Sequence, residues 1–206
     1  MKIIESSAEL INPPSYLEAL ERIEGAARTC YKSEDRIKDG SAEELIRRLI
    51  KSGHESVLEH VSLSVRIICD RGVSHELVRH RLASYSQEST RYCNYSGDKF
   101  DGELTFINPS WYIGYTFKSA MWLTAMEASQ KAYMQMLKEG ASPQEARSVL
   151  PNSLKTELVM TCNIREWRLI FNQRCSLVAH PDMRALMIPL RDKMIELYPI
   201  FFEDLV

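Results

Sequence analysis

The chain has 206 residues, of which 45% are hydrophobic and 26% are charged, with 8 glycines and 8 prolines. This composition is that of an ordinary globular protein, and it excludes collagen-like, low-complexity and wholly disordered chains. The formal net charge of −2 excludes a global positive field that would collect nucleic acid, so we expect any anion to be bound by a local group of cations. A chain of this size buries about 70% of its surface, which favours one large domain over residues 1–206.

Cysteine and histidine spacing indicates a cytoplasmic protein without a metal site. The five cysteines are odd in number and widely spread, which is typical of a reducing compartment. His54 and His60 are six residues apart, about 240° round a helix, so they do not share a face as metal ligands would. The start of the chain has no basic segment followed by an apolar one, and no stretch approaches the ~18 apolar residues of a membrane helix.

Capping signals and hydrophobic spacing define the elements of the first half of the chain. The capping-box pattern of a serine followed three residues later by a glutamate occurs at Ser15 and again at Ser41. In chain order, we predict an extended start at Ile3 and Ile4, a helix from about Tyr16 to Tyr31, a helix from Ser41 that Gly53 ends, a strand over residues 61–68, and a short helix over residues 73–80 capped by Ser74.

The second half is dominated by helical spacing. Residues 110–138 contain no proline, and they contain no glycine after Gly114. This segment predicts one long helix from Ser110 to Lys138 with an apolar stripe of methionine, leucine and tyrosine. After it we predict a short helix over residues 142–149, a strand over residues 155–163, a helix over residues 164–174, and a helix from Pro181 to Tyr198 kinked at Pro189.

Arginines are concentrated in two stretches, residues 71–91 and 147–174, and they form two local positive patches. The guanidinium fork suits bidentate capture of a phosphate or a flat polar ring, whereas the alternative is a set of solvated helix faces with weak surface ion pairs. Within the first stretch, residues 84–90 supply serines, a threonine and a glutamine, which can surround a phosphate and a base with neutral hydrogen bonds. The order of these residues favours a nucleotide site.

One motif in this region resembles a family signature. Arg79-His80-Arg81 is followed after seven residues by Ser89, and this RHR-x7-S pattern is similar to that of the flavin-dependent thymidylate synthases. The resemblance covers nearly the whole chain. Its other parts are the GHES-x-x-EH stretch from Gly53 to His60, the Arg91-Tyr92 pair, the EARSVLP segment around Arg147, and the CNIR and NQR segments between Cys162 and Arg174.

The resemblance implies two sets of binding residues. Arg174 resembles the residue that touches the uracil ring and promotes its ionisation, and it is the implied catalytic residue. The implied dUMP-binding residues are Glu76, Arg79, Gln87, Glu88, Ser89, Thr90, Arg91, Arg147 and Arg174. The implied FAD-binding residues are Cys30, His54, Ser56, Glu59, Arg79, His80, Arg81, Gln87, Asn163, Arg165 and Leu169.

The same resemblance implies an α/β fold in which helices, one of them long, surround an antiparallel sheet. It also implies a homotetramer with active sites shared between subunits, tightly bound FAD, and NADPH and methylenetetrahydrofolate as co-substrates. The implied reaction is reductive methylation of dUMP to dTMP at C5 of the uracil. No cysteine has an activating neighbour in the sequence, so we expect polarisation of the ring by Arg174 rather than attack by an enzyme thiolate.

Two other interpretations remain open on the sequence alone. The first is a non-catalytic nucleotide- or RNA-binding protein that uses the two positive patches for phosphates. The near-neutral charge and the lack of a basic stripe interleaved with aromatic residues argue against RNA. The second is a family member that binds FAD but has lost methyl transfer.

Overall fold

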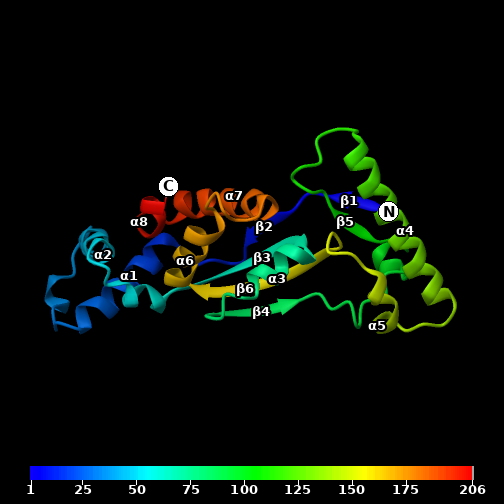
Figure 1. Cartoon of the computed structure of the whole chain (residues 1–206). Helices are drawn as coiled ribbons and strands as arrows, with labels where there is room; N and C mark the ends of the chain where they lie inside the picture. The colour runs from blue at the N-terminus through cyan, green and yellow to red at the C-terminus, as the bar shows by residue number, and fades with distance from the viewer. Residues whose placement is uncertain (206) are drawn as a thin grey trace. The chain divides into compact units, whose positions relative to one another are not determined.

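The computed structural model describes residues 1–205 and has a mixed α/β fold (Figure 1). A four-stranded sheet has the strand order β2-β3-β6-β4, and β1 pairs in parallel with β5. The predicted α/β class with an antiparallel sheet is therefore confirmed. The elements in chain order are β1 (Lys2–Ile4), β2 (Ser7–Leu10), α1 (Tyr16–Thr29), η1 (Glu34–Arg36), α2 (Ser41–Lys51), η2 (Glu55–His60), β3 (Ser62–Asp70), α3 (Arg71–Leu77), β4 (Ala83–Gln87), η3 (Asp98–Phe100), β5 (Thr105–Ile107), α4 (Phe117–Lys138), α5 (Pro143–Ala146), η4 (Arg147–Val149), β6 (Lys155–Asn163), α6 (Ile164–Arg174), α7 (Pro181–Leu197), α8 (Pro199–Phe202) and η5 (Glu203–Leu205), where η marks a 3-10 helix.

The chain divides into two compact units, each assembled from separate segments. Unit 1 comprises Met1–Ser7, Ile67–Arg79 and Tyr85–Val159. Unit 2 comprises Ala8–Arg66, His80–Ser84 and the chain from Met160 onward. Strands β3, β4 and β6 each contribute residues to both units, so neither unit corresponds to one continuous stretch of sequence.

Unit 2 is built from helices around the first part of β3 and the end of β6. Within it α1 contacts α2, and α6 contacts α7 (Figure 1). Trp167 of α6 is fully buried, and its indole nitrogen donates a hydrogen bond to the carbonyl oxygen of Leu63 at 3.1 Å. Buried side chains alternate along β3 with exposed or partly buried ones, as expected for a strand with one face against a core. This core fixes the N-terminal half of α6.

Unit 1 has its own core between α4 and the short strands. Figure 1 shows α4 beside the β1 and β5 pair. The buried cluster joins Phe106 of β5 with Met126 and Tyr133 of α4. The apolar stripe predicted on the long helix therefore packs inside unit 1, although Met121 at its start is half exposed.

Two helix starts and one helix cap differ from the predicted ones, each for a local reason. Asp70 rather than Ser74 caps α3, because its carboxylate accepts from the backbone nitrogen of Val73 at 2.6 Å. Helix α2 starts at Ser41 itself, after Gly40 in the left-handed conformation (φ 75°), and the Ser41 hydroxyl points to another partner. The long helix starts at Phe117, after a capping box between Thr116 and Ser119, and not at residue 110.

Strands β2, β4 and β5 were missed, while the boundaries of the other predicted elements, apart from the start of the long helix, agree within a few residues. Each missed strand has five residues or fewer, so its hydrophobic period is too short to recognise. Within residues 1–205, no helix combines the length and the hydropathy needed to cross a membrane.

Candidate functional site

In unit 1, the dUMP residues implied by the sequence lie at the end of α3, on β4 and the turn after it, and on η4. Both amide hydrogens of Gln87 are donated inside unit 1, to the hydroxyls of Ser74 at 3.0 Å and Thr156 at 3.1 Å. These bonds join β4 to α3 and β6. The group that Gln87 can offer a ligand is therefore its carbonyl oxygen.

The turn after β4 is brought together with the segment around Arg147. The Arg91 Nε donates to the side-chain oxygen of Gln144 at 3.1 Å, and its guanidinium lies 5.2 Å from the centre of the Tyr92 ring. The Ser89 hydroxyl accepts from the backbone nitrogen of Arg91 at 3.2 Å. Arg79, Arg91 and Arg147 are all exposed. The turn thus carries an exposed cation, Arg91, and the Ser89 hydroxyl, and Gln144 ties it to the segment that leads to Arg147.

Glu88 and Thr90 differ from the other members of this set, because their side chains turn inward. The Glu88 carboxylate accepts from the Tyr95 hydroxyl at 2.7 Å and from Lys155 Nζ at 2.6 Å. Burial and this bond raise the pKa of Tyr95 above its usual range. Thr90 is buried. Both oxygens of Glu88 are occupied by partners within unit 1, so it holds the turn in place.

Unit 2 contains a cavity of about 450 Å³ whose lining includes four of the implied FAD residues: Glu59, Asn163, Arg165 and Leu169. Its volume lies in the ~300–1,000 Å³ range of small-molecule sites. Arg165 pairs with Glu59 at 2.6 Å, and the Asn163 side-chain oxygen caps α6 by accepting from Glu166 N at 2.9 Å. Leu82 and Leu169 expose apolar surface at the cavity.

A three-residue chain of polar contacts in unit 2 leads to Arg174. The Arg174 Nε donates to His80 Nε2 at 3.0 Å, and His80 Nδ1 lies 3.5 Å from Glu166 Oε1. Because the Arg174 nitrogen always carries its hydrogen, His80 Nε2 accepts, and neutral His80 holds its proton on Nδ1 toward Glu166. His80 and Glu166 are buried, and burial raises the pKa of Glu166. His80 and Glu166 together hold the partly buried Arg174 in one orientation.

Two of the remaining implied FAD residues, Arg79 and Gln87, belong to unit 1. The others lie elsewhere on unit 2. Ser56 is exposed on η2, and Arg81 is exposed just before β4. Cys30 caps the C-terminus of α1, and His54 lines a different cavity from that of Arg165. Sequence reasoning missed Glu166, Gln144 and Asn172 as site neighbours. Glu166 could have been suspected because it lies one residue after Arg165 in an arginine-rich stretch.

The cysteines differ in exposure: one is exposed, two are buried and two are partly buried. Cys30 is exposed, whereas Cys69 and Cys162 are buried, and all five are free in the described chain. Burial raises the pKa of Cys69 to about 12 and that of Cys162 further, and it raises the pKa of Cys175 to about 11. These thiols are poor nucleophiles at neutral pH. Among residues 1–205, no group of three or more metal-binding side chains is found.

Alkylation is expected to follow this division. At pH 8 a thiol with a pKa of about 12 is about one part in ten thousand ionised, so Cys69 should react with iodoacetamide far more slowly than Cys30. Peptide mass spectrometry of the native protein after timed alkylation measures both rates. Unfolded protein is the control, in which all cysteines should react alike. Comparable native rates at Cys69 and Cys30 would contradict the assigned burial.

Comparison with known proteins identifies the family. Residues 14–200 match the model of the thymidylate synthase complementing protein family, and the chain belongs to that family. The flavin-dependent thymidylate synthase of Geobacter sulfurreducens is 33% identical over 186 residues, covering 87% of this chain and 78% of that protein. The enzyme of the same name from Pyrococcus furiosus is 32% identical over 182 residues, covering 85% of this chain and 74% of that protein. The family membership predicted from the RHR-x7-S motif is confirmed.

A solved structure supports the same fold. The UMP/dUMP methylase PolB from Streptomyces cacaoi, bound with 5-Br dUMP, superposes with a TM-score of 0.77 at 25% identity. The match covers 98% of this chain and 96% of PolB. This chain therefore shares the fold of PolB over essentially its whole length.

Proposed function

We propose that this protein is a flavin-dependent thymidylate synthase that converts dUMP to dTMP, with methylenetetrahydrofolate as one-carbon donor and FAD reduced by NADPH. The observation that carries the proposal is the family match over residues 14–200 together with the RHR-x7-S motif. The described geometry supports it, because unit 1 presents arginines and a serine hydroxyl for a nucleotide monophosphate. The single domain over residues 1–206, the homotetramer and the cytoplasmic location remain parts of this proposal.

The residues of the unit 2 cavity fit a flavin. A flavin needs polar partners for its ring edge and apolar contacts for its faces, and the cavity offers Asn163 and Arg165 beside the exposed Leu82 and Leu169. These residues and Glu59 would hold FAD. When bound, FAD supplies the hydride chemistry that amino-acid side chains lack.

The protein's own contribution to the reaction is binding and charge. Arg79, Arg91 and Arg147 would neutralise the phosphate of dUMP, and Ser89 would donate its hydroxyl to it. Arg174 would stabilise the negative charge that develops on the uracil ring, which makes C5 nucleophilic without a covalent bond to the enzyme. The raised pKa of the buried thiols is consistent with this route, because it keeps them protonated.

One assay tests the proposal. The purified protein should be yellow or become yellow with added FAD, and dUMP should change its flavin spectrum. Incubation with dUMP, methylenetetrahydrofolate and NADPH should yield dTMP, and omission of any one of them should stop it. Protein that cannot take up FAD excludes the proposal, and FAD binding without dTMP indicates a member that has lost methyl transfer. Salt-sensitive RNA binding without NADPH oxidation would support the non-catalytic alternative.

Glu166 is expected to act as a positioning residue for Arg174 through His80. Glu166→Leu removes the acceptor for His80 Nδ1, so His80 can turn and release Arg174, and we expect turnover to fall about tenfold. Glu166→Gln keeps an acceptor oxygen and should retain most of the turnover. Steady-state kinetics should show a lower kcat with little change in the KM for dUMP. Equal kcat in the Leu and Gln variants, at equal FAD occupancy, would contradict this role.

A further inference from the structure

Unit 2 has a second concave region, lined by arginines from three different elements. Arg28 of α1, Arg36 of η1 and Arg48 of α2 all line two cavities, of about 410 Å³ and 570 Å³. Leu45 lies in both linings as well, so the two cavities adjoin. We call Arg28, Arg36 and Arg48 the arginine cluster. None of the three belongs to the residues assigned to dUMP or FAD.

A buried carboxylate forms the floor of this region. Glu24 Oε1 accepts from Arg28 Nε at 3.1 Å, from Arg28 Nη2 at 2.8 Å and from the Ser41 hydroxyl at 2.7 Å. Glu24, Arg28 and Ser41 are each less than 9% exposed. Because one oxygen takes three donors in a buried place, this floor has a fixed geometry.

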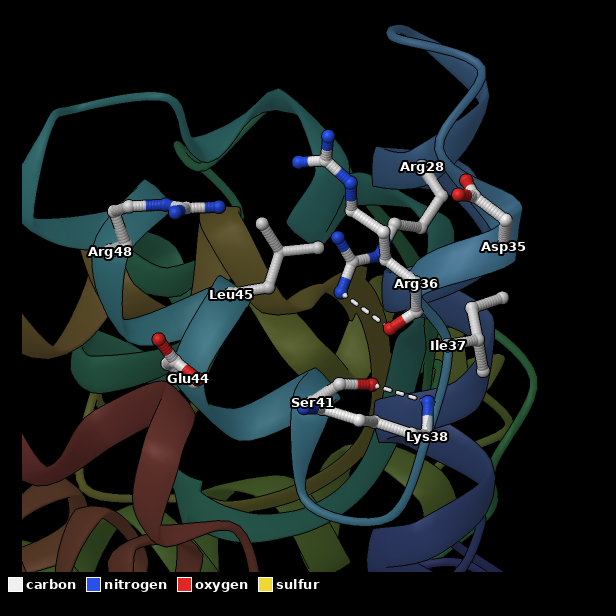
Figure 2. Close-up of a pocket in the computed structure, with 9 residues that line it drawn as sticks. All are labelled: Arg28, Asp35, Arg36, Ile37, Lys38, Ser41, Glu44, Leu45 and Arg48. Carbon is white, nitrogen blue, oxygen red and sulfur yellow. Dashed lines mark hydrogen bonds between the residues drawn. The ribbon is translucent and has the colours of Figure 1, made fainter.

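The floor in turn holds the loop that carries Arg36. Arg28 Nη2 reaches the backbone oxygen of Arg36 at 3.5 Å, and the Lys38 backbone nitrogen donates to the Ser41 hydroxyl at 3.0 Å, as the dashed lines in Figure 2 show. The loop enters at Lys32 and leaves at Gly40, which both have positive φ. Its backbone is therefore tied down while the Arg36 guanidinium stays available.

Charge is unevenly distributed between the two cavities. Asp35 and Glu44 line only the smaller one, whereas the larger has the arginine cluster and His54 and no carboxylate in its lining. Within residues 1–205, the guanidiniums of Arg36 and Arg48 have no hydrogen-bond or ion-pair partner. Figure 2 shows both of them extending toward the space above Leu45. Two arginines that converge without a partner are typical of an anion site.

The larger cavity also has surfaces for a ring. Tyr31 is 81% exposed at its edge, and Ala27, Leu45 and Leu49 supply apolar wall. His54, which the family resemblance implies as a flavin-binding residue, lies at the same cavity. A ligand with an aromatic ring and several oxyanion groups fits this cavity. The ring would contact the apolar residues and the oxyanions would pair with the arginines.

We propose that the arginine cluster binds the multivalent oxyanion of a co-substrate, and this inference rests on the proposed function. Two co-substrates carry that chemistry, because a folate ends in glutamate carboxylates and NADPH carries phosphates. Arg36 and Arg48 each bind the oxyanion through two hydrogen bonds. Arg28, whose charge is offset by Glu24, fixes the loop that carries Arg36. The site recognises the charged end of the ligand and takes no part in the chemical step.

Direct binding of an inert probe tests the site without the reaction. Isothermal titration of the FAD-loaded protein with tripolyphosphate should give saturable binding that weakens at least tenfold in the double variant Arg36→Gln, Arg48→Gln. The matched control is Arg22→Gln, Arg47→Gln, which removes two exposed arginines from α1 and α2. Equal weakening in both double variants would overturn the proposal, because it would show only a general effect of net charge.

Kinetics of the holoenzyme then distinguish the two sources of the oxyanion. If the site takes the folate tail, Arg36→Gln, Arg48→Gln should raise the KM for pentaglutamyl methylenetetrahydrofolate more than that for the monoglutamate. If it takes the dinucleotide, the KM for NADPH should rise more than that for NADH. If the KM values for both folates and both dinucleotides are unchanged, the assignment of the site to a co-substrate is overturned. Intact tripolyphosphate binding without any dTMP would count against the proposed function and not against the site.

Discussion

Replacement of Arg174 by alanine is expected to abolish dTMP formation while the protein stays folded. Arg174 is partly buried and its Nε is bonded to His80, outside the apolar core, so its loss creates no large core cavity. Preorganised groups that stabilise developing charge contribute about 10²–10³ in rate, so turnover should fall by at least about a hundredfold. Conversion of dUMP to dTMP, measured by chromatography, gives the rate directly.

Two further variants test whether the loss of turnover is specific to the guanidinium of Arg174. Arg174→Lys keeps a positive charge but loses the planar fork and the Nε donor to His80, so it should recover little activity. Arg22→Ala removes an exposed arginine of α1 and should leave turnover unchanged. Circular dichroism and bound flavin should be the same in all variants. Normal turnover in Arg174→Ala would remove Arg174 from the mechanism.

Features that depend on near neighbours in sequence were predictable. The Ser15 capping box and the end of α2 before Gly53 follow from residues within one helical turn, and the structure has both. The motif at Arg79 to Ser89 likewise identified the family, because its spacing is a local property.

Features that depend on partners far away in sequence were not predictable. Glu166 meets His80 across more than eighty positions, and Glu88 meets Lys155 across 67. In the sequence each of these glutamates looks like an ordinary surface carboxylate near arginines. Whether such a side chain faces a ligand or holds the scaffold is decided by tertiary packing, which a linear pattern does not contain. Glu88, implied as a substrate residue, has both oxygens occupied for this reason.

The same argument applies to Glu24, for which we expect the largest loss of stability in unit 2. Glu24→Ala leaves Arg28 buried without its counterion and the Ser41 hydroxyl without its acceptor. Removing one partner of a buried ion pair typically costs about 3–5 kcal/mol of the free energy of unfolding. Guanidinium titration followed by tryptophan fluorescence measures this loss. The control Glu21→Ala lies on the exposed side of the same helix and should change stability by less than about 0.5 kcal/mol.

A double variant separates the ion pair from the loop that it holds. Glu24→Leu with Arg28→Met replaces the buried charges by apolar groups of similar size, which is often neutral for stability, so most of the free energy of unfolding should return. The bond from Arg28 to the Arg36 backbone is still lost, and Ser41 no longer has Glu24 as a partner. The loop should then lose its fixed position, and tripolyphosphate binding should stay weak in a stable protein. A double variant as unstable as Glu24→Ala would show that packing around Glu24, and not its charge, governs this part of unit 2.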